Sequence, residues 1–421
     1  MKIRFLTSAL NEALAMAAIV PPKAVSADCP PGFLFVVRDQ VCSIYSRDDT
    51  HQLRVNVPFG EVDEDGSFIF PAEKVGALKF LDGWIEITSV TIEDRFFLSY
   101  ESESGAKQAD ISTIDPRLMQ SLDASLRKAV EGPSLPASLL REGVSMTRPY
   151  LAKVGEEKVG AVFQNLQLFD DSTQEWKESN ANGFLYAADR SRSCSFYSEK
   201  LEGRALAIHG AHLPFLQSFL GRSQGSVTLR QGEGVTYLVN AQSCVLGWAQ
   251  SIVETRRFNY YSLETDAFVL RADKDLFLKA LRYVKAAIDA KRDKIRIQYT
   301  PETNTVVLLA TEGSAKAVSR PIAVKAISEP DQGGSKGAEE GFAANLNINH
   351  LLDLVEPLKA NQFDLRVAPI GGGPGKKSGF AFRTIDTFFL DENGRQIISK
   401  EETDQGKAAE CQVTRFMLCR D

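Results

Sequence analysis

The hydrophobic and polar positions of this chain follow the same order three times. A strand that leads into a short helix and then into a second strand begins at Gly66, at Gly203 and at Gly341. One copy is therefore about 137 residues long, far more than the roughly 20–50 residues of a solenoid or propeller repeat. We interpret the repeat as a whole domain that occurs three times in tandem.

An amphipathic helix opens each copy. In the first copy, apolar residues recur at helical spacing over residues 8–20, and Thr7 or Ser8 is positioned to cap the start. The second helix is predicted to begin near Pro136, because proline suits a first helical turn. The third is predicted to begin after a cap at Asp273 or Asp275. Its predicted inner face contains Leu276, Phe277, Leu281, Val284 and Ile288.

Short strands separated by turns follow each of these helices. Every copy is therefore predicted to be an α+β unit, in which helices cover one face of an antiparallel sheet. The predicted domains are residues 1–130, 131–260 and 261–421. Residues 131–136 are expected to link the first domain to the second, and residues 256–264 the second to the third.

Composition places the chain among soluble globular proteins. It has 421 residues, of which 43% are hydrophobic and 25% charged. The formal net charge of −6 does not indicate nucleic-acid binding, but an acidic chain can still carry a basic stripe. Residues 1–27 resemble a secretory signal, yet Asn11 and Glu12 interrupt the apolar segment, so we favour a helix. No apolar run reaches the roughly 20 residues of a membrane span.

No catalytic or metal site is predicted. Residues 371–378 are rich in glycine, but Ile370 stands where a phosphate-binding loop has its first glycine, and a strand follows in place of a helix. The four histidines form no metal pair, and His209 and His212 are expected to solvate or cap a helix start. The six cysteines lack short paired spacing, so we expect buried free thiols in a reducing compartment. The chain is predicted to be no enzyme and to need no cofactor.

Basic residues recur on the polar sides of the predicted helices. A single one of them is most simply a solvated charge. Their recurrence over three similar units, however, favours a surface that contacts phosphates without reading sequence. The predicted DNA-binding residues are Lys23, Lys74, Lys79, Arg141, Arg148, Arg222, Lys279, Arg282 and Lys285.

Short motifs in order along the whole chain resemble those of the bacterial DNA polymerase sliding clamps, the β-subunit family of DNA polymerase III. Residues 70–74 (Phe-Pro-Ala-Glu-Lys) are similar to the family's Val-Pro-Ala-Arg-Lys. Residues 187–192 (Ala-Ala-Asp-Arg-Ser-Arg) are similar to its Ala-Thr-Asp-Gly-His-Arg. Lys23 stands where the family has a DNA-contacting arginine, and residues 412–418 stand where it has its C-terminal strand. The departures suggest a phage or mobile-element origin.

The resemblance implies a head-to-tail homodimer that forms a ring around double-stranded DNA, with helices lining the hole and sheets outside. Such a ring performs no chemistry; it tethers a DNA polymerase, and a clamp loader places it on DNA. Partners of the family insert a short peptide between the second and third domains. By position, the implied partner-peptide groove contains Ala188, Ser191, Arg192, Ser193, Asn259, Val413, Phe416, Met417 and Leu418.

The two edges that would close the ring carry charges opposite to the pattern common in the family. The predicted interface consists of Glu101, Glu103 and Ile111 on the first-domain edge and Lys316 and Arg320 on the third-domain edge. Complementary charges of this kind set partner choice and association rate more than affinity. The simplest alternative is that they are ordinary solvated charges of two hairpins.

The expected function is a processivity factor in the cytoplasm of a bacterial cell or of a phage-infected host. Two other functions stay open at this point. The first is a clamp-fold protein that closes no ring and acts as a monomeric binding or regulatory module. The second is an exported β-rich binding protein whose first 27 residues are removed.

Overall fold

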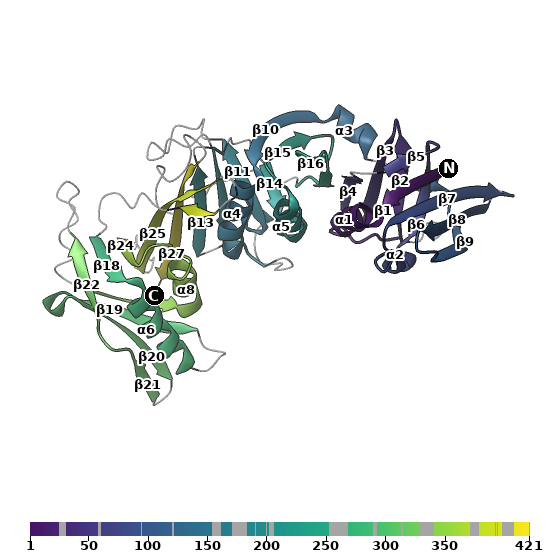
Figure 1. The fold of residues 1–421 in the computed structure, drawn as a ribbon. Coiled ribbons are helices and arrows are strands. Elements are labelled where there is room, and N and C mark those ends of the chain that lie inside the picture. The colour runs from purple at the N-terminus through teal and green to yellow at the C-terminus, as the bar shows by residue number, and fades with distance from the viewer. Residues whose placement is uncertain are drawn as a thin grey trace. The chain divides into compact units, whose positions relative to one another are not determined.

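The structure is a computed structural model. It describes residues 1–420 except 25–30, 58–59, 94, 120–121, 154–160, 171–182, 190, 199, 202–205, 252–267, 289–292, 313–314, 328–340, 371–378, 392, 394 and 398–407. By the packing of its residues, the chain divides into two compact units. Figure 1 labels their helices and strands. The first unit contains Met1–Arg141 and Ala211–Ile252, and the second contains Glu142–Gly210 and Val253–Asp421.

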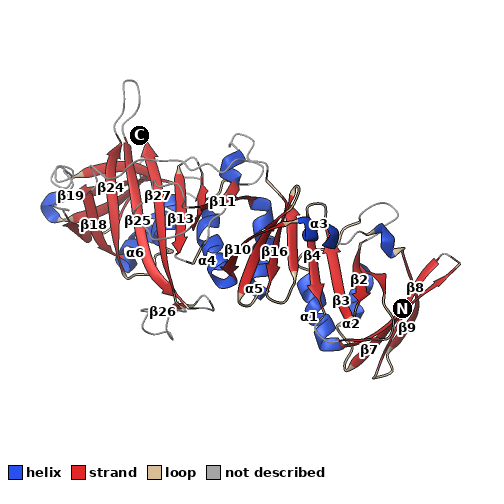
Figure 2. Ribbon diagram, turned by 90° about the horizontal axis from the view of Figure 1, so that it is seen from above, coloured by secondary structure: helices blue, strands red, loops and turns tan. Residues whose placement is uncertain are grey.

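The first unit contains two antiparallel sheets (Figure 2). The five-stranded sheet has the order β5-β1-β7-β8-β9, and its strands are β5 (Gly60–Val62), β1 (Lys2–Leu6), β7 (Trp84–Ile92), β8 (Arg95–Ser102) and β9 (Lys107–Thr113). The eight-stranded sheet has the order β10-β15-β16-β17-β4-β3-β2-β6, and its strands are β10 (Val130–Pro136), β15 (Ser226–Gln231), β16 (Val235–Asn240), β17 (Val245–Ala249), β4 (His51–Asn56), β3 (Val41–Arg47), β2 (Gly32–Arg38) and β6 (Gly66–Pro71). The helices are α1 (Thr7–Ala17), α2 (Ala72–Leu78), α3 (Asp123–Lys128) and α5 (Leu213–Arg222), with 3-10 turns η1 (Pro116–Leu118) and η4 (Gly210–His212). The division between the units falls within α4 (Ala137–Thr147) and within η4.

The described strands of the second unit form one sheet. Its order is β14-β11-β12-β13-β27-β25-β24-β18-β22-β20-β19-β23, with β21 paired to β20 and β26 paired to β25. Its strands are β11 (Asn165–Asp170), β12 (Gly183–Ala188), β13 (Arg192–Ser198), β14 (Leu206–His209), β18 (Phe268–Asp273), β19 (Lys294–Thr300), β20 (Thr305–Glu312), β21 (Ala315–Val318), β22 (Ile322–Ile327), β23 (Phe342–Asn347), β24 (Gln362–Ile370), β25 (Gly379–Leu390), β26 (Gln396–Ile397) and β27 (Ala409–Arg420). The helices are α6 (Lys274–Ala286) and α8 (Ile348–Val355), with 3-10 turns η2 (Arg148–Tyr150), η3 (Ala161–Gln164) and η5 (Pro301–Thr303).

Helices cover the sheets in both units, as the α+β pattern predicts. In the first unit, α1 packs on β3 and β4; in the second, α6 packs on β18, β20 and β22, and α8 on β23, β25 and β27. The side chains between α6, α8 and their sheet form one hydrophobic core, in which Leu281, Val284, Leu351 and Val355 are fully buried. Burial of these apolar side chains, rather than helix propensity, holds the two helices in place.

Two ladders join strands from different sequence repeats. Strand β17 pairs with β4, so that Leu246 lies opposite Leu53. Strand β13 pairs with β27, so that Ser193 lies opposite Phe416. The strands of the middle repeat are therefore shared between the two compact units. The predicted boundaries near residues 130 and 260 stay a prediction.

The first helix differs from the prediction at both ends. It spans Thr7–Ala17, and neither Thr7 nor Ser8 caps it, because the residue before the helix is Leu6 and makes no side-chain capping bond. The Thr7 hydroxyl instead donates to the Gly83 carbonyl at 2.7 Å. Residues 131–136, predicted to be a linker, lie in β10, which pairs with β15. Pro136 therefore ends a strand, and the second helix begins one residue later.

The third opening helix begins as predicted, but one of its expected core residues is wrong. The Asp273 carboxylate accepts from the Leu276 backbone N–H at 2.9 Å and caps α6. Phe277 and Leu281 are buried, whereas Leu276 is 52% exposed. Leu276 lies one residue before Phe277 and hence about 100° around the helix from it, which turns its side chain off the core face.

His212 stands at the N-cap position of α5, as predicted, but its side chain makes no capping hydrogen bond and is not solvated. It is 9% exposed, and its Nδ1 lies 2.9 Å from Nε2 of His51, which is itself 4% exposed. The other nitrogen of His51 lies 3.0 Å from the Asp48 carboxylate. Spacing along the sequence could not reveal this contact, because the two histidines are 161 residues apart.

Candidate functional site

The ladder between β13 and β27 brings predicted groove residues together. Arg192 lies opposite Met417, and Ser193 lies opposite Phe416. Directly opposed residues of an antiparallel pair share a face of the sheet, and neighbours along a strand point to opposite faces. Arg192 and Met417 therefore lie on one face and Ser193 and Phe416 on the other, so the predicted set cannot line a single pocket wall.

The turn between β12 and β13 is organised by Asp189. Its carboxylate accepts from the backbone N–H of Ser191 at 2.8 Å and from that of Arg192 at 2.7 Å. An aspartate that accepts bonds from the residues two and three positions later is the usual way in which this side chain fixes a tight turn. The turn therefore sets where the Arg192 side chain leaves the sheet.

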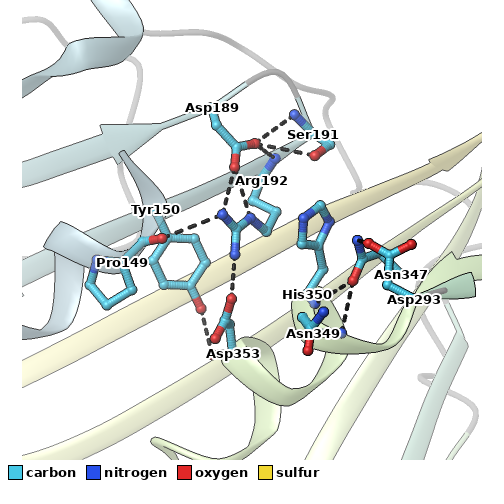
Figure 3. Close-up of polar contacts among 10 residues, drawn as sticks. All are labelled: Pro149, Tyr150, Asp189, Ser191, Arg192, Asp293, Asn347, Asn349, His350 and Asp353. Atoms are coloured by element: carbon cyan, nitrogen blue, oxygen red, sulfur yellow. Dashed lines mark hydrogen bonds and ion pairs between the residues drawn. The ribbon is translucent and has the colours of Figure 1, made fainter. Parts of the chain in front are cut away.

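The Arg192 guanidinium is held by groups from three segments (Figure 3). Its Nε donates to Asp189 at 2.8 Å, and its Nη1 pairs with Asp353 of α8. Its Nη2 lies 3.4 Å from the Pro149 carbonyl, and its charge lies 5.6 Å from the centre of the Tyr150 ring. The Arg192 side chain is 12% exposed, and its guanidinium already bonds to Asp189 and Asp353. Its role in this arrangement is therefore to join β13 to α8.

The amino end of α8 supplies the polar groups next to Arg192. The Asn347 side chain accepts from the N–H of Asn349 at 2.8 Å and from that of His350 at 3.4 Å, which caps the helix. Burial lowers the pKa of His350, and the charge of Arg192 acts in the same direction. Burial raises the pKa of Asp353, while Arg192 opposes that shift.

The remaining predicted groove residues are mostly covered. Val413 is fully buried, Met417 is 1% exposed and belongs to the core beneath α6 and α8, and Phe416 is 6% exposed. Ala188 is also buried, and Ser191 is half-buried. Leu418 lies in β27, but its side chain is outside the described part, as is the whole of Asn259.

Sequence reasoning did not assign Asp189, Tyr150, His350 or Asp353 to this site. Tyr150 is 1% exposed, and its hydroxyl donates to the Asp353 carbonyl at 2.7 Å. A usable signal was present, because His350 and Asp353 are polar residues three positions apart in a short, strongly apolar helix. Such a pair lies on one helix face and calls for a polar partner.

The predicted DNA-binding residues lie at or near helices and are mostly exposed. On α6, Lys279, Arg282 and Lys285 are all exposed, and Arg282 donates to Glu356 at 2.6 Å. Lys23 follows α1 and pairs with Asp49 at 2.9 Å. The others are Lys74 in α2, Lys79 at its end, Arg141 in α4, Arg148 in η2 and Arg222 at the end of α5. Of these, Arg141 is half-buried.

The predicted interface residues lie in or beside hairpins. Glu101 is in β8, next to the edge strand β9, while Glu103 follows β8 and lies 3.7 Å from Arg4 of its own chain. Ile111 is 5% exposed and packs into the sheet's own core. Lys316 lies in β21, which pairs with β20, and Arg320 is exposed beyond it. The pairing of these two edges stays a prediction.

Two further properties bear on the kind of site. Among the described residues, no group of three or more histidine, cysteine, aspartate or glutamate side chains could hold a metal ion. In the same part of the chain, no helix has both the length and the apolar character that crossing a membrane requires.

Of the comparisons with known proteins, the one with solved structures gives matches. No protein-family model matches the sequence, and no curated protein matches it. Solved structures match the full length of the fold. The DNA polymerase III subunit beta from Pseudomonas aeruginosa matches with a TM-score of 0.71 at 15% identity, covering 100% of both chains. The DNA polymerase sliding clamp from Caulobacter crescentus matches with 0.70 at 15%, covering 100% of both. The clamp from Bacillus subtilis matches with 0.72 at 13%, covering 100% of this chain and 99% of its own.

The chain therefore has the fold of the DNA polymerase III β sliding clamps over its whole length, at low sequence identity. This confirms the fold that the short sequence motifs indicated.

Proposed function

We propose that this protein is a DNA polymerase processivity factor that encircles double-stranded DNA as a head-to-tail homodimer. The observation that carries the proposal is the full-length match to sliding clamps, which covers the whole chain and not one domain of it. A tether of this kind holds its partner by encircling DNA, and the cations exposed on the helices agree with such a contact to DNA.

The DNA contact is assigned to the exposed basic residues of the helices. Lys279 and Lys285 extend from α6 away from the core that holds Leu281 and Val284. Flexible ammonium groups on a helix surface suit phosphates, which carry no base identity. Binding should therefore be independent of sequence and should weaken steeply as salt is added.

A polymerase and a clamp loader are proposed to bind at the ladder between β13 and β27. Phe416 is its least buried described apolar residue, at 6% exposed, so a partner must displace neighbouring groups to reach it. Because Arg192 is already committed to Asp189 and Asp353, a partner is expected to bind through apolar anchors and backbone contacts. Phe416→Ala should reduce polymerase binding by about tenfold or more.

The decisive experiment asks whether the protein stays on closed DNA. It should be retained on circular DNA after loading and lost when the circle is linearised. Changing Lys279, Arg282 and Lys285 together to Ser should weaken retention, and each lost phosphate contact should reduce the salt slope by about 0.9. A matched control removes the same charge from strands by changing Arg271, Arg296 and Lys325 to Ser, which should leave retention unchanged.

A second candidate function is a clamp-fold protein that closes no ring and acts as a monomeric binding module. The burial of Ile111 and the contact of Glu103 with Arg4 favour it, because both remove groups from the proposed interface. Mass in solution separates the two: the ring has twice the 46.4 kDa of one chain. Equal retention on circular and linear DNA would reject encirclement.

A further inference from the structure

Two aromatic side chains in the described part of the chain are exposed to solvent, and both lie among the cations just assigned to DNA. Tyr283 of α6 is 57% exposed, and Phe80, which follows α2, is 86% exposed. Singly exposed apolar side chains are ordinary in folded proteins, so these two rings are informative through the cations beside them and not through their exposure alone. The coincidence at two separate helices calls for one explanation.

On α6, Tyr283 lies beside a basic residue. It lies four residues after Lys279, and therefore about one turn along the same side of the helix, whereas Lys285, two residues later, lies on the opposite side. The opposite side of the helix holds Phe277, Leu281 and Val284 in the core. The ring consequently cannot reach its own core and is presented outward on the side of the helix that carries the Lys279 ammonium group.

The second ring has a different local origin but the same surroundings. Helix α2 ends at Leu78, and the Phe80 N–H bonds to the Ala77 carbonyl at 3.2 Å, which continues the last turn. Leu78 is fully buried, whereas Phe80 two residues later is on the outside. Lys79 precedes the ring directly. An exposed apolar ring and a cation therefore stand next to each other at the end of this helix as well.

An intact duplex offers such rings no base faces for stacking, because its bases are stacked on one another and mainly phosphates and groove edges face a protein. Unpaired bases do present their faces, and aromatic side chains that stack on them beside backbone-binding cations are the usual arrangement for sequence-independent binding of single strands. We propose that Tyr283 and Phe80 stack on unpaired bases, so that the helix surfaces hold single-stranded DNA in addition to duplex. This rests on the proposed assignment of the helices to DNA.

The test measures the affinity of the full-length chain for two fluorescent oligonucleotides at fixed salt: oligo-dT and a blunt duplex of the same length. Tyr283→Ala and Phe80→Ala should each weaken oligo-dT binding by about fivefold or more, and the double variant by more than either. Duplex binding should change by less than about twofold. Tyr283→Phe should retain oligo-dT binding, because the ring and not the hydroxyl stacks.

Two controls make the result specific to bases. Leu276→Ala removes an exposed apolar side chain from the same helix and should leave both affinities unchanged. An abasic oligonucleotide keeps the phosphates but offers no base, so the intact protein should bind it no better than the double variant binds oligo-dT.

Unchanged oligo-dT affinity in the double variant would overturn the inference, as would an equal loss for duplex and oligo-dT. A change in the mass of the particle would show instead that the rings form a contact between copies of the chain. Failure of the proposed function has a different signature. In that case, changing Lys279, Arg282 and Lys285 together to Ser leaves retention on duplex DNA unchanged, independently of the result for the Tyr283 and Phe80 variants.

Discussion

Arg415 and Arg192 lie on one face of the same ladder, and their surroundings differ sharply. Arg192 is paired with two carboxylates. Arg415 is fully buried, and its three guanidinium nitrogens have no hydrogen-bond partner among the described residues. Two groups that interact with it supply no anion, because burial raises the pKa of the Cys194 thiol to about 12 and that of the Tyr150 hydroxyl well above its usual value. Both groups are therefore neutral at physiological pH.

The two arginines should respond to the same substitution with opposite signs. Arg415→Met removes a buried charge that has no hydrogen-bond partner among the described residues, and should raise the free energy of unfolding by about 1–4 kcal/mol. Arg192→Met leaves Asp189 and Asp353 without their cation and should lower it by about 2 kcal/mol, a moderate value because Asp353 is partly exposed. Urea titrations of both variants measure this. A loss of stability in Arg415→Met would mean that the guanidinium has a partner.

No local pattern could have distinguished these residues. Both arginines stand in alternating strand sequences, and whether a carboxylate meets them depends on an element far away in the chain. Asp353 reaches Arg192 across 161 positions of sequence. Met417 is similar: the family resemblance assigned it to the groove, but pairing with β13 and β25 turns it into the core beneath α8.

At the scale of elements, periodicity predicted the helices well and the ladders poorly. The cap at Asp273 and the buried stripe of α6 follow from spacing alone, because both depend on residues within one helical turn. Residues 131–136 were expected to be a linker, because they contain a glycine and two prolines. In the structure they pair with β15 as an edge strand. Ladder formation depends on a distant partner, which a single segment does not disclose.

Helix α8 should give the second unit a measurable pH dependence. Burial and Arg192 lower the pKa of His350, while Asp189 and Asp293 oppose this. As pH falls from about 7 to 5, the unfolded chain takes up a proton at this histidine before the folded chain does, so stability decreases. His350→Gln should flatten that part of the stability profile without changing it above pH 7.5. His209→Gln, outside this cluster, is the control, and an equal effect of both would contradict the assignment.

At the scale of the whole molecule, ring closure is the property that the sequence predicts but a single chain does not display. We expect Glu101, in β8, to face Lys316 of the partner subunit. Glu101→Lys should shift the dimer toward monomer at low salt, and adding Lys316→Glu should restore it, because exposed charges act strongly only when salt does not screen them. Sedimentation at low and high salt measures the shift.

Glu103 is left unchanged in this test, because it contacts Arg4 and accepts from the Trp84 N–H at 3.2 Å within its own chain. Glu233→Lys makes the same charge reversal in a turn outside the proposed edges and should not affect the dimer. If the Glu101 reversal has no effect, or if the second reversal fails to rescue it, these two strands do not meet.

Because ladders join β17 to β4 and β13 to β27, the segment that repeats in the sequence is not the same as the unit that folds. The sequence pattern predicts three successive copies of one segment, but a single copy released from its neighbours would carry strands whose ladder partners belong to another copy. An isolated middle copy would present open strand edges, which other chains can pair with. Duplication could therefore lengthen such a gene in one step, whereas excision of a copy would leave its neighbours prone to aggregate.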